Sequence, residues 1–447
     1  MSKSVADTLA PLIRPMVNDE IPVKIACWDG SRAGPSSAPW QLNISRRGLR
    51  RLLWAPNEVG LARAYVSGDI DIDGDMLACL EALEKVSDPK TGPHTTADVR
   101  TKLAFAKAAL RLGFIGLPPK PPREEAKSIH AHRHDKRRDA AAISHHYDVG
   151  NDFYRLVLGE SMAYSCAYWT PAAKDLCAAQ FAKCDLIARK LGLTAGMRLL
   201  DVGCGWGTFA LHAARNYGVQ VVGVTLSREQ ADYADNRMTE AGVSQSVQIR
   251  VQDYRDVDDG PYDAISSIGM AEHVGAAMLP GYAARLLALL RPRGRLLNSA
   301  ISRRPGRPLA FSKRSFIDRY VFPDGEIEPM ATMIEALEGA GFEVRDVESL
   351  REHYARTLRA WVSNLEANWD EAVSCTSAAR ARVWRLYMAG SALGFAANRL
   401  GLNHVLAVKS TRQGRSYMPA TRAELLTPGV KNHPAEDCAG ADRSDAA

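Results

Sequence analysis

Asp201 and the three glycines that follow it at alternate positions, Gly203, Gly205 and Gly207, are the clearest group of residues able to hold a ligand. They stand in RLLDVGCGWG, where an apolar strand pattern gives way to a helical pattern. Glycine suits such a turn because a Cβ would hinder unusual φ angles and the close approach of a ligand to the backbone. The turn also directs the free N–H groups of the following helix toward that ligand. The spacing is not the G-x-G-x-x-G of dinucleotide folds, so the motif alone predicts a site without naming its ligand.

Further polar residues follow other predicted strands. Thr225 ends VQVVGVT, Asp253 follows VQIRV, and Glu272 follows YDAISSIG. Strands and helices alternate through this region, which predicts a parallel sheet with helices on both faces. Ligands of such sheets bind beyond the carboxyl ends of the strands. We therefore expect an α/β fold with a mostly parallel, doubly wound, Rossmann-like sheet, and we expect these residues to share one pocket.

A second unusual stretch, ISHHYDVGNDFYRLVLGESMAYSCAYW, precedes the first strand. It concentrates aromatic, Asn, Asp, Gly and Cys residues more densely than a helix surface or a strand requires, so it either caps a core or lines a pocket. His145 and His146 in this stretch, and His273 beside Glu272, do not form a ligand set for a metal. We expect no metal site.

The composition is that of an ordinary globular protein, with 46% hydrophobic and 24% charged residues among 447. No apolar run approaches the roughly 20 residues of a membrane span, and the N-terminus lacks a signal-peptide pattern. Eight scattered cysteines include no C-x-x-C, which fits reduced thiols in the cytoplasm. The net charge of +6 would favour an anionic membrane or nucleic acid, and it also suits many soluble enzymes.

The first part of the chain reads as a separate, small mixed α/β domain. PVKIACWDG and WQLNIS are predicted strands, and helical patterns follow them. The acidic run DIDIDGD lacks the twelve-residue calcium loop that ends in Glu, so we interpret it as a solvated turn.

A basic helix is predicted over Val99–Leu117. It can lie on an anionic bilayer or pack between domains, and the sequence leaves both interpretations open. The proline-rich and basic segment after it reads as a linker. The basic stripe of the predicted helix comprises Arg100, Lys107 and Arg111, and the apolar residues of the helix are Leu103, Phe105, Leu110, Leu112 and Phe114.

Four regions are therefore expected. They are an N-terminal domain (1–95), the amphipathic helix with the basic linker (96–140), the domain that contains the glycine turn (141–428) and a disordered tail (429–447).

The D-x-G-x-G-x-G turn on an open α/β sheet resembles that of the S-adenosylmethionine-dependent methyltransferases. In that class the turn contacts the methionine moiety, the end of the second strand approaches the ribose, and an acidic residue after the third strand binds adenine. Aromatic faces can also hold the cationic sulfonium. By this resemblance the cofactor residues are Tyr164, Ser165, Asp201, Gly203, Gly205, Trp206, Gly207, Thr225, Leu226, Gln230, Asp253 and Tyr254.

Eight ordered motifs narrow the resemblance to the cyclopropane-fatty-acyl-phospholipid synthase family, which includes the mycolic-acid cyclopropane synthases. They run from residue 143 to about 412, and they are HYDVGNDFY, MAYSCAYW, LLDVGCGWG, GVTLSREQ, QDYRD, SIGMAEHVG, FIDRYVFPDG and HYARTLRAW. The N-terminal region resembles that of the longer, phospholipid-acting members, in which it helps to engage lipid. The resemblance implies methyl transfer from S-adenosylmethionine to a cis double bond of a phospholipid acyl chain, followed by proton removal and closure of a cyclopropane ring.

In this family a bicarbonate ion is thought to accept the proton. The residues that correspond to its site are Cys166 through its backbone, Glu272, Ile301 through its backbone, and Tyr354. Cys166 as a thiol nucleophile is the other interpretation, but this chemistry does not need one.

Ser299 stands where the family commonly has a histidine, in NSAIS. Serine can donate a hydrogen bond to an anion but cannot carry a positive charge or shuttle a proton as imidazole does. The product is therefore open between a cyclopropane ring and a methylene- or methyl-branched chain, and a lipid-binding protein without turnover is a third hypothesis. No N-P-P-Y motif follows the fourth strand, which argues against nucleic acid as substrate. The expected partner is membrane phospholipid, contacted peripherally from the cytoplasmic face, by a protein that is a candidate homodimer.

Overall fold

The computed structural model describes residues 4–14, 21–86, 99–114, 117–125, 149–306, 315–322 and 325–426. Its chain divides into two compact units. The first unit contains residues 1–128, 308–323 and 369–393, and the second contains residues 129–307, 324–368 and 394–447. The predicted linker and the predicted C-terminal tail lie largely or wholly outside the described residues, as do His145 and His146.

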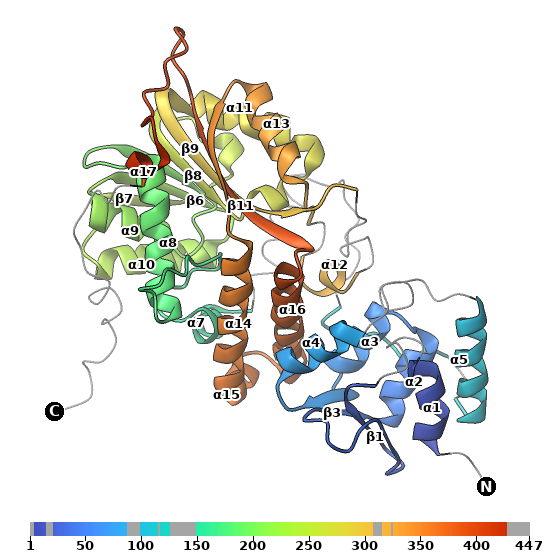
Figure 1. The fold of residues 1–447 in the computed structure, drawn as a ribbon. Helices are drawn as coiled ribbons and strands as arrows, with labels where there is room; N and C mark the ends of the chain where they lie inside the picture. Colours follow the sequence, from blue (N-terminus) through green and yellow to red (C-terminus); the bar gives the residue numbers. More distant parts are fainter. Residues whose placement is uncertain are drawn as a thin grey trace, which may run out of the picture. The chain divides into compact units, whose positions relative to one another are not determined.

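The second unit is built on a seven-stranded sheet in the order β10-β11-β9-β8-β5-β6-β7 (Figure 1). The five strands from β9 to β7 pair in parallel, whereas β11 is antiparallel to both of its neighbours, β9 and β10. This arrangement confirms the predicted doubly wound sheet. The strands are β5 (Arg198–Val202), β6 (Gln220–Thr225), β7 (Val247–Val251), β8 (Tyr262–Ile268), β9 (Leu290–Arg303), β10 (Glu343–Ser349) and β11 (Leu400–Val408).

Two hydrophobic layers cover the sheet because successive side chains of a strand point to opposite faces. Leu199 and Leu297 belong to the layer formed with α8, α9 and α10. Leu200 and Leu296 belong to the layer formed with α11 and α13. The helices and 3-10 turns of this unit are α7 (Asn151–Leu158), α8 (Leu176–Leu191), α9 (Thr208–Tyr217), α10 (Arg228–Glu240), η2 (Tyr254–Asp256), η3 (Ala271–His273), η4 (Ala276–Met278), α11 (Leu279–Leu289), α13 (Met330–Ala340), α14 (Arg351–Ala367) and α17 (Arg422–Leu425).

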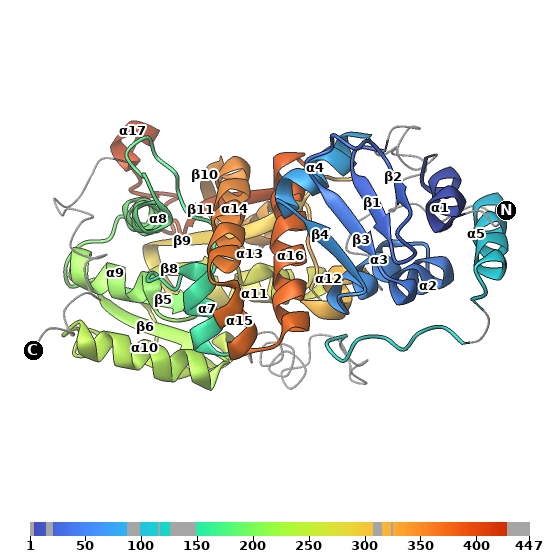
Figure 2. The ribbon, with the colours of Figure 1, turned by 90° about the horizontal axis from the view of Figure 1, so that it is seen from below.

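The first unit contains a four-stranded sheet in the order β2-β1-β3-β4 (Figure 2). The acidic run interpreted as a solvated turn is partly a strand, because Ile70–Asp73 forms β4 and pairs antiparallel with β3. Ile70 is buried in the core, so this strand must pack against the sheet. The acidic residues that alternate with the isoleucines made the strand hard to recognise in the sequence. The elements before the linker are α1 (Val5–Ile13), β1 (Lys24–Cys27), β2 (Arg32–Ala33), β3 (Gln41–Ile44), α2 (Arg46–Trp54), α3 (Glu58–Val66), β4, α4 (Met76–Val86) and α5 (Val99–Arg111).

The predicted basic helix is α5, which ends at Arg111, before Gly113 takes a φ of 70°. Phe105 and Phe114 are buried in the core of the first unit. Leu103 and Leu110, by contrast, are 57% and 68% exposed. One side of the helix is therefore a packing face, and the other presents apolar residues to the surface.

Three helices from the later part of the chain belong to the first unit: α12 (Phe316–Tyr320), α15 (Trp369–Cys375) and α16 (Ala378–Ala396) up to Leu393. The Glu125 carboxylate joins α12 to the N-terminal elements. It accepts two 2.7 Å hydrogen bonds from Arg63 on α3. From α12 it accepts a 3.0 Å bond from the Tyr320 hydroxyl and a further bond from Arg319. Much of helix α16 is buried, including Trp384, Met388 and Leu393, whereas Arg382 and Arg385 on the same helix are half-buried.

No helix of the described ranges is long and apolar enough to span a bilayer.

Candidate active site

The glycine turn has the geometry that the sequence predicts. Gly203, Gly205 and Gly207 have φ angles of 74°, 54° and 76°. The N–H groups of Gly203 and of the residue after it donate to the Val224 carbonyl at 2.9 and 3.0 Å, which anchors the turn to β6. A Cβ on Gly205 would meet no atom within 4 Å, so this glycine borders open space. A Cβ on Gly207 would lie 2.7 Å from Met238, so that glycine permits packing against α10.

Asp201 is the last residue but one of β5, just before the turn, and is buried. Its carboxylate accepts a 2.6 Å hydrogen bond from the Ser266 hydroxyl on β8. Burial raises the pKa of Asp201 to about 6, while the Ser266 hydrogen bond and the charge of Lys183 oppose this rise. Asp201 therefore links the two central strands at their carboxyl ends.

The end of β6 carries a buried polar network. The Thr225 hydroxyl donates to the Gln230 amide oxygen at 2.9 Å and accepts from the Ser227 N–H at 3.2 Å. The Ser227 hydroxyl in turn accepts from the Gln230 N–H and caps α10. Half-buried Leu226 lies within this turn, so the residues predicted to approach a ribose form one ordered loop.

Asp253 follows β7 and is ion-paired with Arg255, whose guanidinium contacts both carboxylate oxygens, at 2.8 and 2.6 Å. Tyr254 is buried, with its ring edge-to-face against Tyr282 at 5.5 Å. Sequence reasoning missed Arg255, although its place two residues after the acid was a readable signal.

Helix α8 contributes two buried polar side chains that the sequence analysis did not single out. Gln180 donates its amide to the Ala163 and Ser165 carbonyls, at 3.2 and 2.9 Å. The Lys183 ammonium donates to the Ser165 hydroxyl at 3.2 Å. These contacts hold the loop that carries Tyr164, Ser165 and Cys166 against the sheet.

A chain of aromatic rings runs beside this loop. Tyr154 packs against Trp206 at 4.7 Å and against Tyr164 at 5.8 Å. Tyr164 also lies 5.4 Å from Trp361 on α14, and Trp361 lies 6.0 Å from Tyr354. Trp206 is buried, and its indole N–H donates to the Asn151 amide oxygen at 2.7 Å, so its ring is fixed by packing. Half-buried Tyr164 is the better candidate for contact with a cation.

Glu272 lies where β8 ends and β9 continues. The parallel pairing of β8 with β9 stops at Ile268 and Ser299. Beyond that point β9 has no partner from β8, and the Ile301 N–H of β9 donates instead to the Glu272 carboxylate at 2.7 Å. Its second oxygen is buried and has no hydrogen-bond partner among the described residues. Burial raises the pKa of Glu272 to about 7, although the bond from Ile301 opposes the rise.

Cys166 and Tyr354 meet at Leu350. The Cys166 thiol lies 3.8 Å from the Leu350 carbonyl, and the Tyr354 N–H donates to the same carbonyl at 3.1 Å. The Leu350 N–H donates to the Leu402 carbonyl, and Leu402 is the cross-strand partner of Ile301. Burial raises the pKa of the Cys166 thiol, so a thiolate is disfavoured. The structure thus brings Cys166, Glu272, Ile301 and Tyr354 together through β9, β11 and the start of α14.

Ser299 is buried and shares a face of β9 with Ile301. Its direct cross-strand partner is His404 on β11, so the two side chains lie on the same face of the sheet. His404 is 1% exposed, and its Nδ1 atom has no hydrogen-bond partner among the described residues. Burial lowers the pKa of His404 well below its ordinary value, which favours the neutral ring. Sequence reasoning missed this imidazole because strand pairing is not visible in the sequence.

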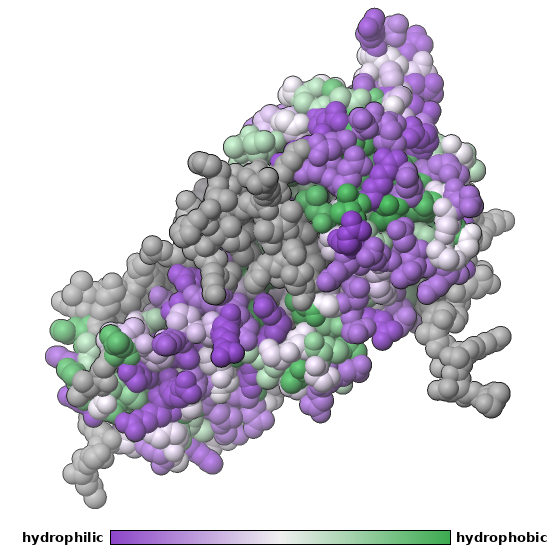
Figure 3. Space-filling view, turned by 180° about the vertical axis from the view of Figure 1, so that it is seen from behind, coloured by the Kyte–Doolittle hydropathy of each residue, from purple (hydrophilic) through white to green (hydrophobic). Residues whose placement is uncertain are grey.

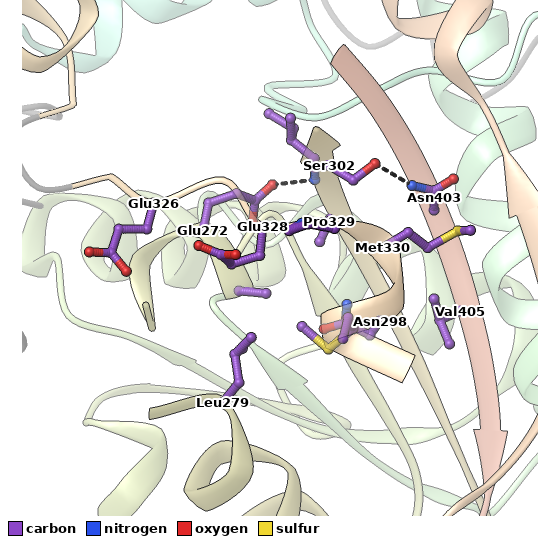
Figure 4. A pocket seen from close by; sticks show the side chains of 14 residues that line it. Glu272, Leu279, Asn298, Ser302, Glu326, Glu328, Pro329, Met330, Asn403 and Val405 are labelled. Atoms are coloured by element: carbon purple, nitrogen blue, oxygen red, sulfur yellow. Dashed lines mark hydrogen bonds between the residues drawn. The ribbon is translucent and has the colours of Figure 1, made fainter. Parts of the chain in front are cut away.

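A hollow of about 400 Å³ that opens to solvent lies beside Glu272, on the α11 and α13 face of the sheet (Figure 4). In that view Glu272, Glu326 and Glu328 lie on one side, and Asn298 and Met330 lie on the other. Within the described ranges, no three His, Cys, Asp or Glu side chains gather closely enough to hold a metal ion. The hollow is lined by Ala271, Glu272, Leu279, Asn298, Ala300, Ile301, Ser302, Glu326, Glu328, Pro329, Met330, Met333, Asn403 and Val405.

The chain is similar to several known proteins. Residues 134–405 match the family model described as mycolic acid cyclopropane synthetase. A probable fatty acid methyltransferase of Mycobacterium tuberculosis is 42% identical over 89% of this chain and 93% of its own. The cyclopropane-fatty-acyl-phospholipid synthase of Escherichia coli is 36% identical over 60% of this chain and 68% of its own. The crystal structure of the mycolic acid cyclopropane synthase CmaA1 complexed with SAH and CTAB is similar, with 34% identity, a TM-score of 0.58 and coverage of 60% of this chain and 98% of that one.

Proposed function

Because this chain belongs to the mycolic acid cyclopropane synthetase family of S-adenosylmethionine-dependent methyltransferases, we propose that it methylates the cis double bond of phospholipid-bound unsaturated acyl chains and closes a cyclopropane ring. The observation that carries this proposal is the buried Glu272 carboxyl group, with one oxygen bonded to Ile301 and the other unpartnered among the described residues. Methyl addition to an alkene leaves a cation, and ring closure needs a group that removes a proton from the added methyl. A carboxyl group with a pKa of about 7 suits that task near neutral pH.

The glycine turn and the loops after β6 and β7 would hold S-adenosylmethionine. Open space beside Gly205 leaves room for the cofactor against the backbone, and the Thr225 network and Asp253 would contact the ribose and adenine. When bound, S-adenosylmethionine supplies the electrophilic methyl group. Tyr164 and its aromatic neighbours would stabilise positive charge at the reacting centre because ring faces attract cations.

The residues present also fit a small anion such as bicarbonate, which would supply a proton acceptor when bound. The Ser299 hydroxyl is a hydrogen-bond donor, and so is the Glu272 O–H when Glu272 is protonated and the anion is the base in its place. His404 lies opposite Ser299 as a neutral ring with an unpartnered nitrogen. Anion binding would therefore rest on neutral donors, which makes it weaker than binding to an imidazolium.

This difference supports the alternative product, a methylene- or methyl-branched acyl chain, as the second candidate. The Mycobacterium tuberculosis relative that is 42% identical to this chain is named a probable fatty acid methyltransferase, without reference to a ring. Loss of a proton from a neighbouring carbon would give the methylene branch from the same cation.

Lipid contact is proposed for the first unit. Leu103, Leu110 and Leu117 are exposed, and Lys107 and Arg111 are exposed on the same helix as the first two. Apolar side chains beside basic ones suit the surface of an anionic bilayer. On the face drawn in Figure 3, hydrophobic residues reach the surface in small patches between hydrophilic ones, which fits peripheral contact.

The test is to incubate the purified protein with S-adenosylmethionine and vesicles of unsaturated phospholipid, and to analyse the released fatty esters by mass spectrometry and proton NMR. High-field cyclopropyl protons are expected. Vinylidene protons would establish the alternative product instead. Unchanged lipid, together with measured cofactor binding, would refute both forms of the proposal.

A further inference from the structure

Glu272 lies between the edge of β9 and the hollow. One of its carboxyl oxygens accepts the Ile301 N–H at the edge of β9. The residue also lines the hollow, together with Asn298 and Ala300 of β9. The Glu272 carboxyl group is therefore placed both at the strand edge and at a hollow that opens to solvent.

Two further carboxylates line the hollow. Glu326 is tied to the turn that carries Glu272, because its N–H donates to the Glu272 carbonyl at 3.1 Å and its carboxylate accepts the Ala276 N–H at 3.2 Å. Glu328 is held to β9, since Arg303 donates its N–H to the Glu328 carbonyl at 3.2 Å and its guanidinium lies 3.4 Å from the carboxylate. These contacts hold both glutamates beside Glu272 at the mouth of the hollow.

Asn298 supplies an independent sign that the hollow holds water. The residue is 1% exposed, and its side-chain oxygen accepts the Tyr282 hydroxyl at 3.0 Å. Its side-chain nitrogen is buried without a partner among the described residues, as is the second oxygen of Glu272. A buried amide donor and a buried carboxyl oxygen that line one hollow are the partners that an ordered water requires.

We propose that this hollow is the proton exit of the active site, in which Glu272 passes a proton through water to Glu328 and Glu326 and from them to solvent. The proposal rests on the proposed function, which releases one proton from the added methyl in each turnover. The O–H bond of protonated Glu272 breaks, its electron pair restores the carboxylate, and the proton moves to pocket water while a proton of that water moves to the outer carboxylate. The outer carboxylate then releases its proton to solvent, and nothing is oxidised or reduced.

Such an exit is needed because a bound acyl chain would exclude water from the reaction side of Glu272. A proton taken from substrate would then reach solvent through the hollow, where Glu326 and Glu328 are the other carboxylates among the described lining residues. Glu326 and Glu328 would act as positioning and relay groups. They would not contact substrate or cofactor.

The experiment uses the full chain with Glu326→Gln, Glu328→Gln and the double variant, and with Glu335→Gln/Glu338→Gln as control. Both control residues are exposed on α13 and do not line the hollow. The measurements are the dissociation constant for S-adenosylhomocysteine, kcat on unsaturated phospholipid vesicles, the solvent deuterium isotope effect, and recovery of kcat on addition of formate.

For the double variant we expect unchanged binding of S-adenosylhomocysteine, a kcat reduced by about tenfold or more, a larger solvent isotope effect and partial recovery with formate, which is small enough to enter the hollow. The control variant should match wild type in every measurement. Unchanged kcat and isotope effect in the double variant, or an equal loss in the control, would overturn the proton exit while wild-type turnover still upheld the function. Absence of product from wild type would overturn the proposed function and the exit with it.

Discussion

Substitution of Glu272 by glutamine should stabilise the folded protein and abolish turnover. Folding raises the pKa of this carboxyl from 4.5 to about 7. The folded protein then binds more protons than the unfolded chain between these pH values, so wild type loses stability as the pH rises through this window. A shift of about 2.5 units corresponds to about 3 kcal/mol. Glutamine keeps an oxygen for the Ile301 N–H and carries no charge, so the variant should escape this loss.

The measurement is urea unfolding of wild type and Glu272→Gln between pH 5 and 8, with exposed Glu335→Gln as control. The difference in free energy of unfolding between variant and wild type should grow by about 3 kcal/mol in favour of the variant over this range. Because the proteins share the first unit, the difference reports on the second unit. The reasoning fails if the difference is independent of pH, or if the variant keeps turnover.

Four further outcomes are expected. Gly205→Ala should weaken S-adenosylhomocysteine binding, measured by calorimetry, and should lower Tm less than Gly207→Ala does. Both glycines have a positive φ that strains alanine, but only the Cβ at Gly207 would also lie 2.7 Å from Met238. Cys166→Ala should retain turnover within a few-fold, since the buried thiol has a raised pKa and supplies no thiolate. A wild-type intermediate alkylated at Cys166 that the variant loses would contradict this. Ser299→His should raise the cyclopropane fraction of the product, measured by NMR. An unchanged fraction would show that position 299 does not determine the product. Glu125→Gln should destabilise the first unit by about 3 kcal/mol at pH 7. Because the pKa of Glu125 is lowered, this difference in free energy of unfolding should vanish as the pH falls through that pKa. Urea unfolding of both proteins at pH 7 and pH 3 will check this.

The sheet of the second unit was predictable because each strand carries its own apolar pattern and each turn its own glycine or polar residue. The three positive φ angles at Gly203, Gly205 and Gly207 follow directly from the spacing in the sequence. β4 was misinterpreted because the acidic residues of Ile70–Asp73 hide a buried partner for β3. A local pattern reports the exposed face of a strand and cannot report the strand that lies beside it.

The candidate site was predictable only in its types of residue. Glu272 and Ile301 could be named from motifs, but their hydrogen bond depends on where β8 ends relative to β9. His404 was invisible as a partner of Ser299 because the two are joined by register across a sheet and lie far apart in the chain. Lys183 was not singled out, since the burial of an ammonium beside Ser165 can be read only from three-dimensional packing.

The composition of the first unit has a consequence for synthesis of the protein. Its N-terminal part leaves the ribosome first, yet the unit is completed only when residues 369–393 emerge, more than 200 residues later. At about 5 to 20 residues per second this delay lasts tens of seconds. Throughout that time the surface that receives the apolar helix α16 is without its partner, so the nascent chain is exposed to aggregation and depends on chaperones for longer than a domain with contiguous sequence would.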